Sequence, residues 1–466
     1  MRKSILLLAT VIMVIVACAA GSACVLPSKA KLPDSGGESH YTSVPDGGES
    51  FYESEDPFES EDLPESDEGS IETELFKFTP INGGSGYSVS KCSDYDKKAY
   101  PENLTIPSEF NNKPIKSIGK QAFAGCWKLV SVEIPEGVTS IGEWAFAGCW
   151  KLVSVEIPEG VTSIGYCAFY HCDLLATAKI PSSVKEIGES AFVRCKRLTS
   201  ITIPDGVSAI RDFTFTDCAG LTSVIIPNSV TTIGREAFEG CAGLTSVVIP
   251  NGVREIELKA FSECENLVKI SIPDSVVILD EDVFYKCNDS LYVKDGGIIY
   301  VDKWVVGVEN REIGSAVIKD GTKGIANCAF DFCKSLTSVT MPVGLTSIGI
   351  LSFCSCRNLA SVTMPGVKYI GNDAFRDCSG LTSVVLSDGL ISIGGWAFNY
   401  CESLTSIVIP NGVTSIGDNA FSNCRSLANV TFDGTVAQWN RVQKGYYWMS
   451  DTNVTTVQCS DGDVLL

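Results

Sequence analysis

A 21-residue stretch occurs twice in this chain without a change. Residues 122–142 read AFAGCWKLVSVEIPEGVTSIG, and residues 145–165 repeat the same letters. Similarity at a fixed period is typical of solenoid proteins, in which each unit buries its apolar face by stacking on its neighbours. The duplication therefore predicts one repeat array rather than several globular domains, although the chain has 466 residues.

The repeat runs along most of the chain, and a Phe-x-x-Cys pair marks each unit. Successive pairs lie 23 residues apart, except for one spacing of 22 between Cys356 and Cys378 and one longer gap after Cys287. The pairs are Phe123/Cys126, Phe146/Cys149, Phe169/Cys172, Phe192/Cys195, Phe215/Cys218, Phe238/Cys241, Phe261/Cys264, Phe284/Cys287, Phe330/Cys333, Phe353/Cys356, Phe375/Cys378, Phe398/Cys401 and Phe421/Cys424.

Each unit carries the pattern of a short strand. Leu129, Val132 and Ile134 follow the spacing LxxVxI, which is the strand portion of a leucine-rich repeat. Alternation directs Val132 and Ile134 inward and Glu133 outward, so every unit adds one strand to a parallel sheet. Pro135 ends the strand because it has no amide hydrogen to donate.

The rest of the unit is expected to lie behind this sheet. After a tight turn, residues 138–142 (VTSIG) form a second extended piece, whose Val138 and Ile141 return to the core. Residues 122–129 then place core positions at spacings of one, three and three, which suits a short helical turn. The predicted fold class is a mainly β repeat solenoid, with a parallel sheet of short strands and short helical or 3₁₀ turns behind it.

The units resemble the BspA-like class of leucine-rich repeat, because the strand pattern is joined to I-G-x-x-A-F-x-x-C-x-x-L. The resemblance covers about residues 80 to 460. It departs from the common leucine-rich pattern at Pro135, Pro158 and Pro181, which stand where an Asn ladder would begin. Members of this class occur mainly on bacterial surfaces and also in some protozoa. The resemblance therefore implies a surface protein that acts in adhesion or in host and matrix interaction.

The first residues have the order of an export signal. Arg2 and Lys3 precede an apolar run that is too short to span a membrane comfortably. Ile15-Val16-Ala17-Cys18 then resembles a bacterial lipoprotein signal, which implies that residues 1–17 are removed and that Cys18 carries a lipid anchor. The alternative is ordinary cleavage after Ala23 and simple secretion.

Residues 18–74 form a segment that differs in composition from the array. Between Val25 and Glu74 there are 15 acidic residues and 2 lysines, which account for −13 of the chain's net charge of −20. With little aliphatic surface to offset the entropy of ordering, the segment is predicted to be a disordered acidic tether.

Three further segments depart from the repeat. Residues 75–119 are expected to form an N-terminal cap with a first unit, and residues 432–466 a C-terminal cap, on either side of the array at 120–431. Within the array, residues 288–323 predict an inserted β-meander that projects from the solenoid. Its aromatic side chains either contact a partner or close a small satellite core. They are Tyr292, Tyr300 and Trp304.

In the C-terminal cap, the sequence predicts one helix and one last strand. Val436, Trp439 and Val442 follow helical spacing behind Thr435, which can cap a helix. The sequence VTTVQC, residues 454–459, is expected to add the strand.

No sequence motif of an enzyme is present. The two histidines, His40 and His171, have no acid or nucleophile partner at a motif spacing. Glu133 and Glu156 should lie about 5 Å apart on adjacent strands, near the separation of a retaining glycosidase pair. On an open surface, however, nothing raises the pKa of one above the other, so we expect no enzyme, no catalytic residue and no cofactor.

The 20 cysteines are expected to be mostly free thiols in the core, where Cys behaves as a small apolar residue. Stacked equivalents point in parallel directions, which makes disulfides between them awkward. Three local pairs could oxidise or bind metal, but none has the CxxC spacing of a strong zinc site, so no metal is predicted. They are Cys167/Cys172, Cys328/Cys333 and Cys354/Cys356.

The outward side of the predicted sheet is the candidate binding surface. Its N-terminal part presents Ser131, Glu133, Ser154, Glu156 and Lys179, and it could bind an extended protein or a glycan, or be a plain solvated surface. The chain has no basic patch, which argues against nucleic acid as a partner.

Two tryptophans of the duplicated units, Trp127 and Trp150, extend this candidate surface. They either form a stacking platform for sugar rings or a hydrophobic anchor, or else pack over the adjoining turn.

The sequence as a whole favours a non-enzymatic scaffold at the cell surface that binds an extracellular protein or glycan. Two alternatives remain. One is a structural envelope spacer without a specific ligand, and the other is an accessory protein in carbohydrate processing.

Overall fold

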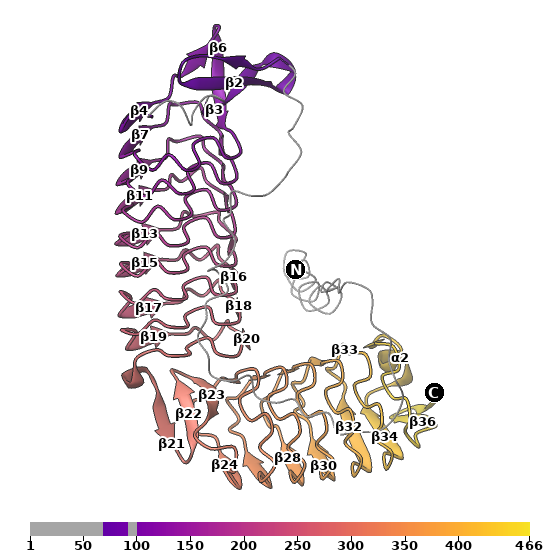
Figure 1. Cartoon of the computed structure of the whole chain (residues 1–466). Coiled ribbons are helices and arrows are strands. Elements are labelled where there is room, and N and C mark those ends of the chain that lie inside the picture. The colour runs from indigo at the N-terminus through magenta and orange to yellow at the C-terminus, as the bar shows by residue number, and fades with distance from the viewer. Residues whose placement is uncertain (1–68, 92–99) are drawn as a thin grey trace, which may run out of the picture. The chain divides into compact units, whose positions relative to one another are not determined.

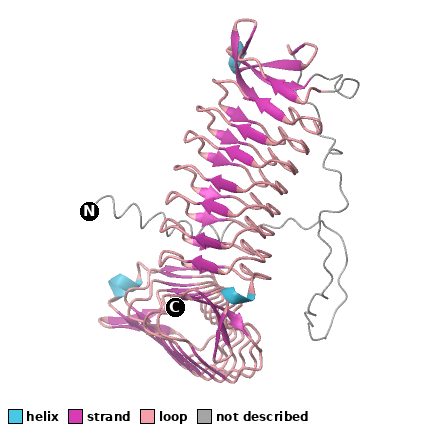
Figure 2. Ribbon diagram, turned by 90° about the vertical axis from the view of Figure 1, so that its left-hand side faces the viewer, coloured by secondary structure: helices cyan, strands magenta, loops and turns pink. Residues whose placement is uncertain are grey.

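The computed structural model describes residues 69–91 and 100–466, which form a solenoid of stacked coils (Figure 1, Figure 2). Each coil has two short strands and a run of turns, and helices are nearly absent from these residues. The predicted mainly β solenoid is therefore confirmed. The expected signal peptide with Cys18, and the acidic tether as far as residue 68, lie outside the described residues.

The first strand row contains one strand from each coil, formed by the LxxVxI segment. Most neighbouring strands pair in parallel and in step with the repeat, so that Val132 of one coil lies opposite Val155 of the next, although the row is divided into five separate sheets. The strands are β4 (Asn103–Thr105), β7 (Ser131–Glu133), β9 (Ser154–Glu156), β11 (Thr177–Lys179), β13 (Ser200–Thr202), β15 (Ser223–Ile225), β17 (Ser246–Val248), β19 (Lys269–Ser271), β24 (Ser315–Val317), β26 (Ser338–Thr340), β28 (Ser361–Thr363), β30 (Ser383–Val385), β32 (Ser406–Pro410), β34 (Asn429–Asp433) and β36 (Thr456–Cys459).

The second strand row is formed by the VTSIG segment, which makes a two-residue strand in most coils. Its members also pair in parallel, as between Ile141 and Ile164. The strands are β6 (Lys113–Ile118), β8 (Ser140–Ile141), β10 (Ser163–Ile164), β12 (Glu186–Ile187), β14 (Ala209–Ile210), β16 (Thr232–Ile233), β18 (Glu255–Ile256), β20 (Ile278–Leu279), β25 (Gly324–Ile325), β27 (Ser347–Ile348), β29 (Tyr369–Ile370), β31 (Ser392–Ile393), β33 (Ser415–Ile416) and β35 (Gln443–Lys444).

The third side of each coil, which we call the turn row, differs from the expected short helix or 3₁₀ turn. In the first full coil, Gln121 and Gly125 have φ values of 53° and 71°. A right-handed helix does not continue through such left-handed residues. The amide of Cys126 bonds to the Phe123 carbonyl within the coil, at 3.2 Å, whereas the amide of Phe123 bonds to the Ala145 carbonyl of the next coil, at 2.7 Å. The turn row is thus hydrogen-bonded to the neighbouring coil through its backbone, as a strand in a sheet would be.

The periodic Phe and Cys side chains fill the centre of the coils. Neighbouring Phe rings stack with nearly parallel planes, and the centroids of Phe146 and Phe169 lie 5.4 Å apart. The thiol of Cys172 donates to the Phe146 carbonyl of the preceding coil at 3.3 Å, and most other periodic thiols repeat this contact. The cysteines of the three local pairs are free thiols.

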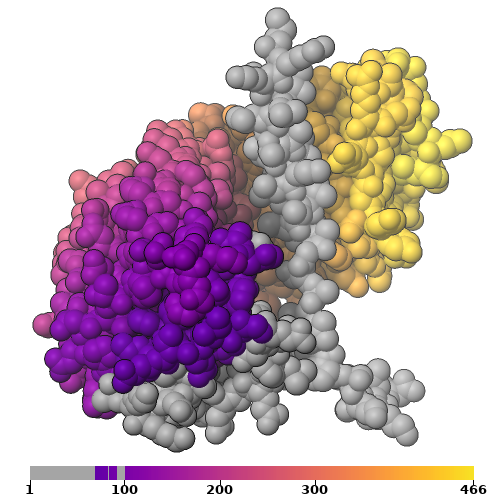
Figure 3. Space-filling view, turned by 90° about the horizontal axis from the view of Figure 1, so that it is seen from above, coloured from indigo at the N-terminus to yellow at the C-terminus, as the bar shows by residue number. Residues whose placement is uncertain are grey.

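The two ends of the array carry caps. At the N-terminal end, Phe76 and Tyr100 meet Phe123 edge to face, and this cap faces the viewer in indigo in Figure 3. At the C-terminal end, Trp448 meets Phe421 in the same way. The N-terminal cap contains β1 (Ile71–Glu72), β2 (Phe76–Ile81), η1 (Asn82–Gly84), β3 (Gly86–Lys91) and β5 (Glu109–Phe110). The C-terminal cap adds α2 (Val436–Trp439) and β37 (Gly462–Leu465).

Helix α2 begins where the sequence predicts. Thr435 caps it, since its side chain accepts a bond from the Gln438 amide and the Gln438 side chain bonds to the Thr435 amide. The strand expected from VTTVQC is β36 (Thr456–Cys459).

The inserted meander belongs to the body of the solenoid, and the expectation that it projects is wrong. Following η3 (Asp289–Leu291), strands β21 (Val293–Asp295), β22 (Ile298–Val301) and β23 (Trp304–Val308) pair antiparallel, and β23 pairs in parallel with β25. The aromatic side chains also form no separate satellite core. Trp304 is buried with the coils before the meander, whereas Tyr300 is buried with the coils after it. The meander thereby joins two apolar cores.

Candidate functional site

The structure brings the predicted polar residues together on the outward side of β7, β9 and β11, which we call the N-terminal face. Glu133 lies opposite Glu156 in the parallel register, and Glu156 lies opposite Lys179. Ser131 and Ser154 occupy the other outward position of the same strands. This arrangement follows from strand alternation, because the residue between them is buried in each strand.

Polar contacts across the strands link this face into a ladder. The Ser131 hydroxyl donates to the Asn103 side chain at 2.6 Å, and the Thr105 hydroxyl donates to Glu133 at 3.2 Å. Lys179 bonds to Glu156 at 2.6 Å. The hydrogen bond and the positive charge of Lys179 lower the pKa of Glu156 below its ordinary value. Glu156 is therefore an anion at neutral pH and not a proton donor.

Trp127 and Trp150 lie in the turn that leads into this face, four residues before Ser131 and Ser154. They are 48% and 55% exposed, so neither indole is packed away over the adjoining turn. The ammonium groups of Lys128 and Lys151 lie 5.0 and 5.8 Å from the centre of the Trp127 ring. The two tryptophans thus form a half-exposed tryptophan ridge, and both ammonium groups lie over its Trp127.

A second group of residues lies on the turn row and was missed by the sequence analysis. Trp144 meets Tyr166 and Tyr170 of the next coil, with ring centroids 5.4 and 5.6 Å away and planes inclined at 77° and 62°. We call these three residues the aromatic cluster. The signal was available, because most equivalent positions of other coils carry small or polar residues, such as Gln121 for Trp144 and Ala147 for Tyr170. At the position of Trp144, only Phe213, Leu351 and Trp396 are also large and apolar.

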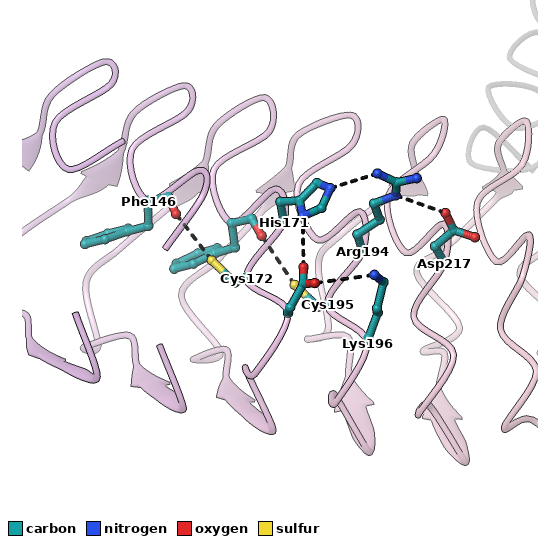
Figure 4. Close-up of polar contacts among 9 residues, drawn as sticks. Phe146, His171, Cys172, Arg194, Cys195, Lys196 and Asp217 are labelled. Atoms are coloured by element: carbon teal, nitrogen blue, oxygen red, sulfur yellow. Dashed lines mark hydrogen bonds and ion pairs between the residues drawn. The ribbon is translucent and has the colours of Figure 1, made fainter. Parts of the chain in front are cut away.

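A polar network, drawn in Figure 4, begins at His171, which follows Tyr170 of the aromatic cluster in the chain. His171 contacts Asp173 through Nδ1 at 2.9 Å and Arg194 through Nε2 at 2.8 Å. Asp173 also contacts Lys196 at 3.4 Å, and Arg194 contacts Asp217 at 3.5 Å. Because an arginine can only donate, Nε2 of His171 is the acceptor, which places the imidazole proton on Nδ1 facing Asp173.

The network does not form a catalytic arrangement. Both nitrogens of His171 are engaged, and the adjacent thiol of Cys172 points into the core toward the Phe146 carbonyl. Burial raises the pKa of Cys172 far above its ordinary value, so it is no nucleophile at neutral pH. Across the residues that the structure describes, no three His, Cys, Asp or Glu side chains gather to hold a metal ion.

Comparisons with known proteins place the repeats in a family. Residues 95–222, 208–294 and 323–443 match the BspA type leucine-rich repeat region, in six copies. A leucine-rich repeat protein from Bacteroides ovatus is 28% identical over 82% of this chain and 92% of its own, with a TM-score of 0.47. A leucine rich cell surface protein from Faecalibacterium prausnitzii is 31% identical over 82% of this chain and 99% of its own, with a TM-score of 0.43. A search among curated proteins found no match.

Proposed function

The chain belongs to the BspA-type leucine-rich repeat proteins, and we propose that it is a non-enzymatic scaffold on the cell surface that binds an extracellular protein or glycan. The binding surface is the N-terminal face together with Trp127 and Trp150. Export follows from the signal-like first residues, and a lipid on Cys18 holds the chain at the membrane, with the acidic segment as a spacer.

The half-exposed tryptophan ridge carries this proposal. Exposed tryptophans beside a ladder of hydroxyl and carboxylate groups supply what interfaces use, namely an apolar anchor within a polar surround. The repeat itself does not require these indoles, because Ala219 and Ala242 occupy the equivalent position in other coils.

The electrostatics of the face support binding rather than catalysis. A retaining glycosidase needs one carboxyl with a raised pKa beside an ionised one. Here Lys179 instead lowers the pKa of Glu156. Residues 69–91 and 100–466 contain no helix with the length and hydrophobicity of a membrane span.

The binding proposal is tested by screening the full chain against matrix proteins and a glycan array. The double variant Trp127→Ala/Trp150→Ala should bind the retained ligand at least tenfold more weakly, because buried aromatic anchors carry most of the energy of an interface. Trp396→Ala is the matched control, since Trp396 is 40% exposed on a distant coil, and it should bind like wild type. Equal loss in both variants would contradict the assignment of the face. Binding to nothing would favour the envelope spacer, and turnover of a glycan would favour the accessory role in carbohydrate processing.

The lipid anchor is tested separately by Cys18→Ala. The variant should move from the membrane fraction to the soluble fraction, whereas continued membrane association would reject the anchor. Release of the wild-type chain into the medium would favour simple secretion.

A further inference from the structure

We propose that the aromatic cluster of Trp144, Tyr166 and Tyr170 is a second binding site, separate from the N-terminal face, and that it takes an uncharged glycan chain. The site lies on the turn row, whereas the N-terminal face belongs to the first strand row. Its occupation therefore does not depend on the function proposed above.

The geometry of the three rings suits a sugar. Trp144 meets the two tyrosines at steep angles, so the rings form a corner rather than a flat stack. Tyr166 is 41% exposed, and Trp144 and Tyr170 are half-buried, so the corner is held in place on one side and open to solvent on the other. Pyranose rings present apolar C–H faces that pack on aromatic rings. Their hydroxyls need polar groups at the edge of the binding site.

The fold does not require these aromatic residues. Trp144 has a φ of 56°, a left-handed conformation that is unfavourable for a bulky side chain. Most other coils place polar or small residues at this position, such as Gln121, Ser190 and Glu236, although Phe213, Leu351 and Trp396 also occupy it. The two copies of the duplicated stretch also differ here, because Glu143-Trp144 stands before the second copy where Lys120-Gln121 stands before the first. Residues that break the repeat and meet one another point to a local role beyond stacking the coils.

The polar network holds His171, the residue next to Tyr170 of the cluster, in place. His171 lies against Tyr170, with ring centroids 5.3 Å apart, and is itself held between Asp173 and Arg194 (Figure 4). A side chain that is held before binding loses less entropy on binding. The network therefore pre-orders Tyr170, which in turn borders Trp144.

The charges around the cluster favour an uncharged ligand. Each basic group in the network has an acidic partner, since Arg194 contacts Asp217 and Lys196 contacts Asp173. Glu143, adjacent to Trp144, contacts Lys120 at 3.5 Å. An anionic glycan needs unbalanced cations, which these paired groups do not supply, whereas paired carboxylates and a guanidinium at the rim can still exchange hydrogen bonds with hydroxyls.

The test uses the full chain and an array of neutral oligosaccharides, sulfated or uronic-acid oligosaccharides, and unmodified peptides. The variant Trp144→Gln/Tyr170→Ala carries the residues that neighbouring coils use at these positions, so it should fold, which thermal unfolding checks. It should bind the retained neutral oligosaccharide at least tenfold more weakly than wild type. Trp127→Ala/Trp150→Ala should bind that oligosaccharide like wild type, which separates this site from the N-terminal face.

A second variant keeps the test decisive if the first does not fold. Tyr166→Glu carries the residue found at positions 143 and 189 of the neighbouring coils, and it should also weaken binding of the neutral oligosaccharide. Unchanged affinity in the folded variants would overturn the proposal. So would retention of acidic oligosaccharides or peptides alone, or of nothing on the array.

Discussion

The periodic phenylalanines stabilise this fold residue by residue, since each ring is buried and stacks on the ring of the next coil. Phe238 contacts Phe215 and Phe261, with centroids 5.4 and 5.2 Å away, and it has no exposed surface. Phe332 is 49% exposed on the turn row, although it is the same residue type. Location in the coil therefore decides what a phenylalanine contributes.

We predict that Phe238→Ala lowers the free energy of unfolding by about 3–5 kcal/mol, because it opens a cavity in the stacked column. Phe332→Ala should change it by no more than about 0.5 kcal/mol. Chemical denaturation of both variants measures the difference. Equal costs would show that the column does not carry the stability assigned to it.

The stability of the chain should also depend on the titration of His171. Burial lowers the pKa of His171 below its ordinary value of 6.5, and the charge of Arg194 adds to this shift while Asp173 opposes it. The charge of Lys196 also lowers this pKa, and Tyr170 lies against the ring. Because the folded state favours the neutral form, its contribution is complete above pH 6.5 and is lost as the pH falls through the lower folded pKa.

We therefore predict that wild type loses more stability than His171→Gln between pH 7.5 and pH 5. Denaturant midpoints at the two pH values test this, and all other titratable groups are common to both proteins. A larger loss in the variant would contradict the neutral state assigned to His171.

At the residue scale, the sequence predicted the outward ladder well, because strand alternation places Ser131, Glu133 and Glu156 without knowledge of neighbours. It could not predict the aromatic cluster. Trp144 and Tyr170 are 26 positions apart, and their contact depends on the left-handed turns that set the path of the turn row.

At the scale of the element, the meander is where the regular pattern stops and the two cores are joined. β23 replaces a strand of the second row, and Trp304 packs directly against Gly324 of β25. A Cβ on Gly324 would lie 2.4 Å from the indole ring. Gly is needed here for close approach rather than for an unusual backbone angle.

We predict that Gly324→Ala lowers the free energy of unfolding by about 1–3 kcal/mol, since the added Cβ would overlap the buried indole of Trp304. Gly314→Ala is the matched control in the same coil, where an added Cβ meets nothing within 4 Å, and it should be nearly neutral. Thermal unfolding of the two variants measures the contrast, and similar values would contradict the tight junction.

The sequence predicted the strands of the meander but not their place. Antiparallel pairing among β21, β22 and β23 follows from short turns, which are local. The parallel pairing of β23 with β25 and the division of Tyr300 and Trp304 between two cores depend on contacts that no local pattern encodes. The turn behind the sheet keeps the three-residue hydrogen-bond spacing of the expected helical or 3₁₀ turn. It does not form a continuous helix, because apolar spacings of three do not reveal the left-handed residues between them.

At the scale of the whole molecule, repetition made the architecture predictable. Each coil has the same pattern as its neighbour and stacks on it, so a single 23-residue pattern predicts both strand rows and the column of Phe rings. The same repetition hides function, since residues that serve stacking recur and only the departures from the repeat can carry a specific site. The departures on consecutive coils near the N-terminal end supply both surfaces that we propose.

The most direct test of the central claim is hydrogen–deuterium exchange of the full chain with and without its ligand. The ligand is the matrix protein or glycan that wild type binds and that Trp127→Ala/Trp150→Ala binds more weakly. Our account predicts slower exchange on binding at residues 127–133 and 150–156, which contain the tryptophan ridge and strands β7 and β9. It predicts no change at residues 402–408, where the same repeat positions carry Glu402 and Val408. Protection confined to the C-terminal coils, or equal protection along the whole first strand row, would contradict it.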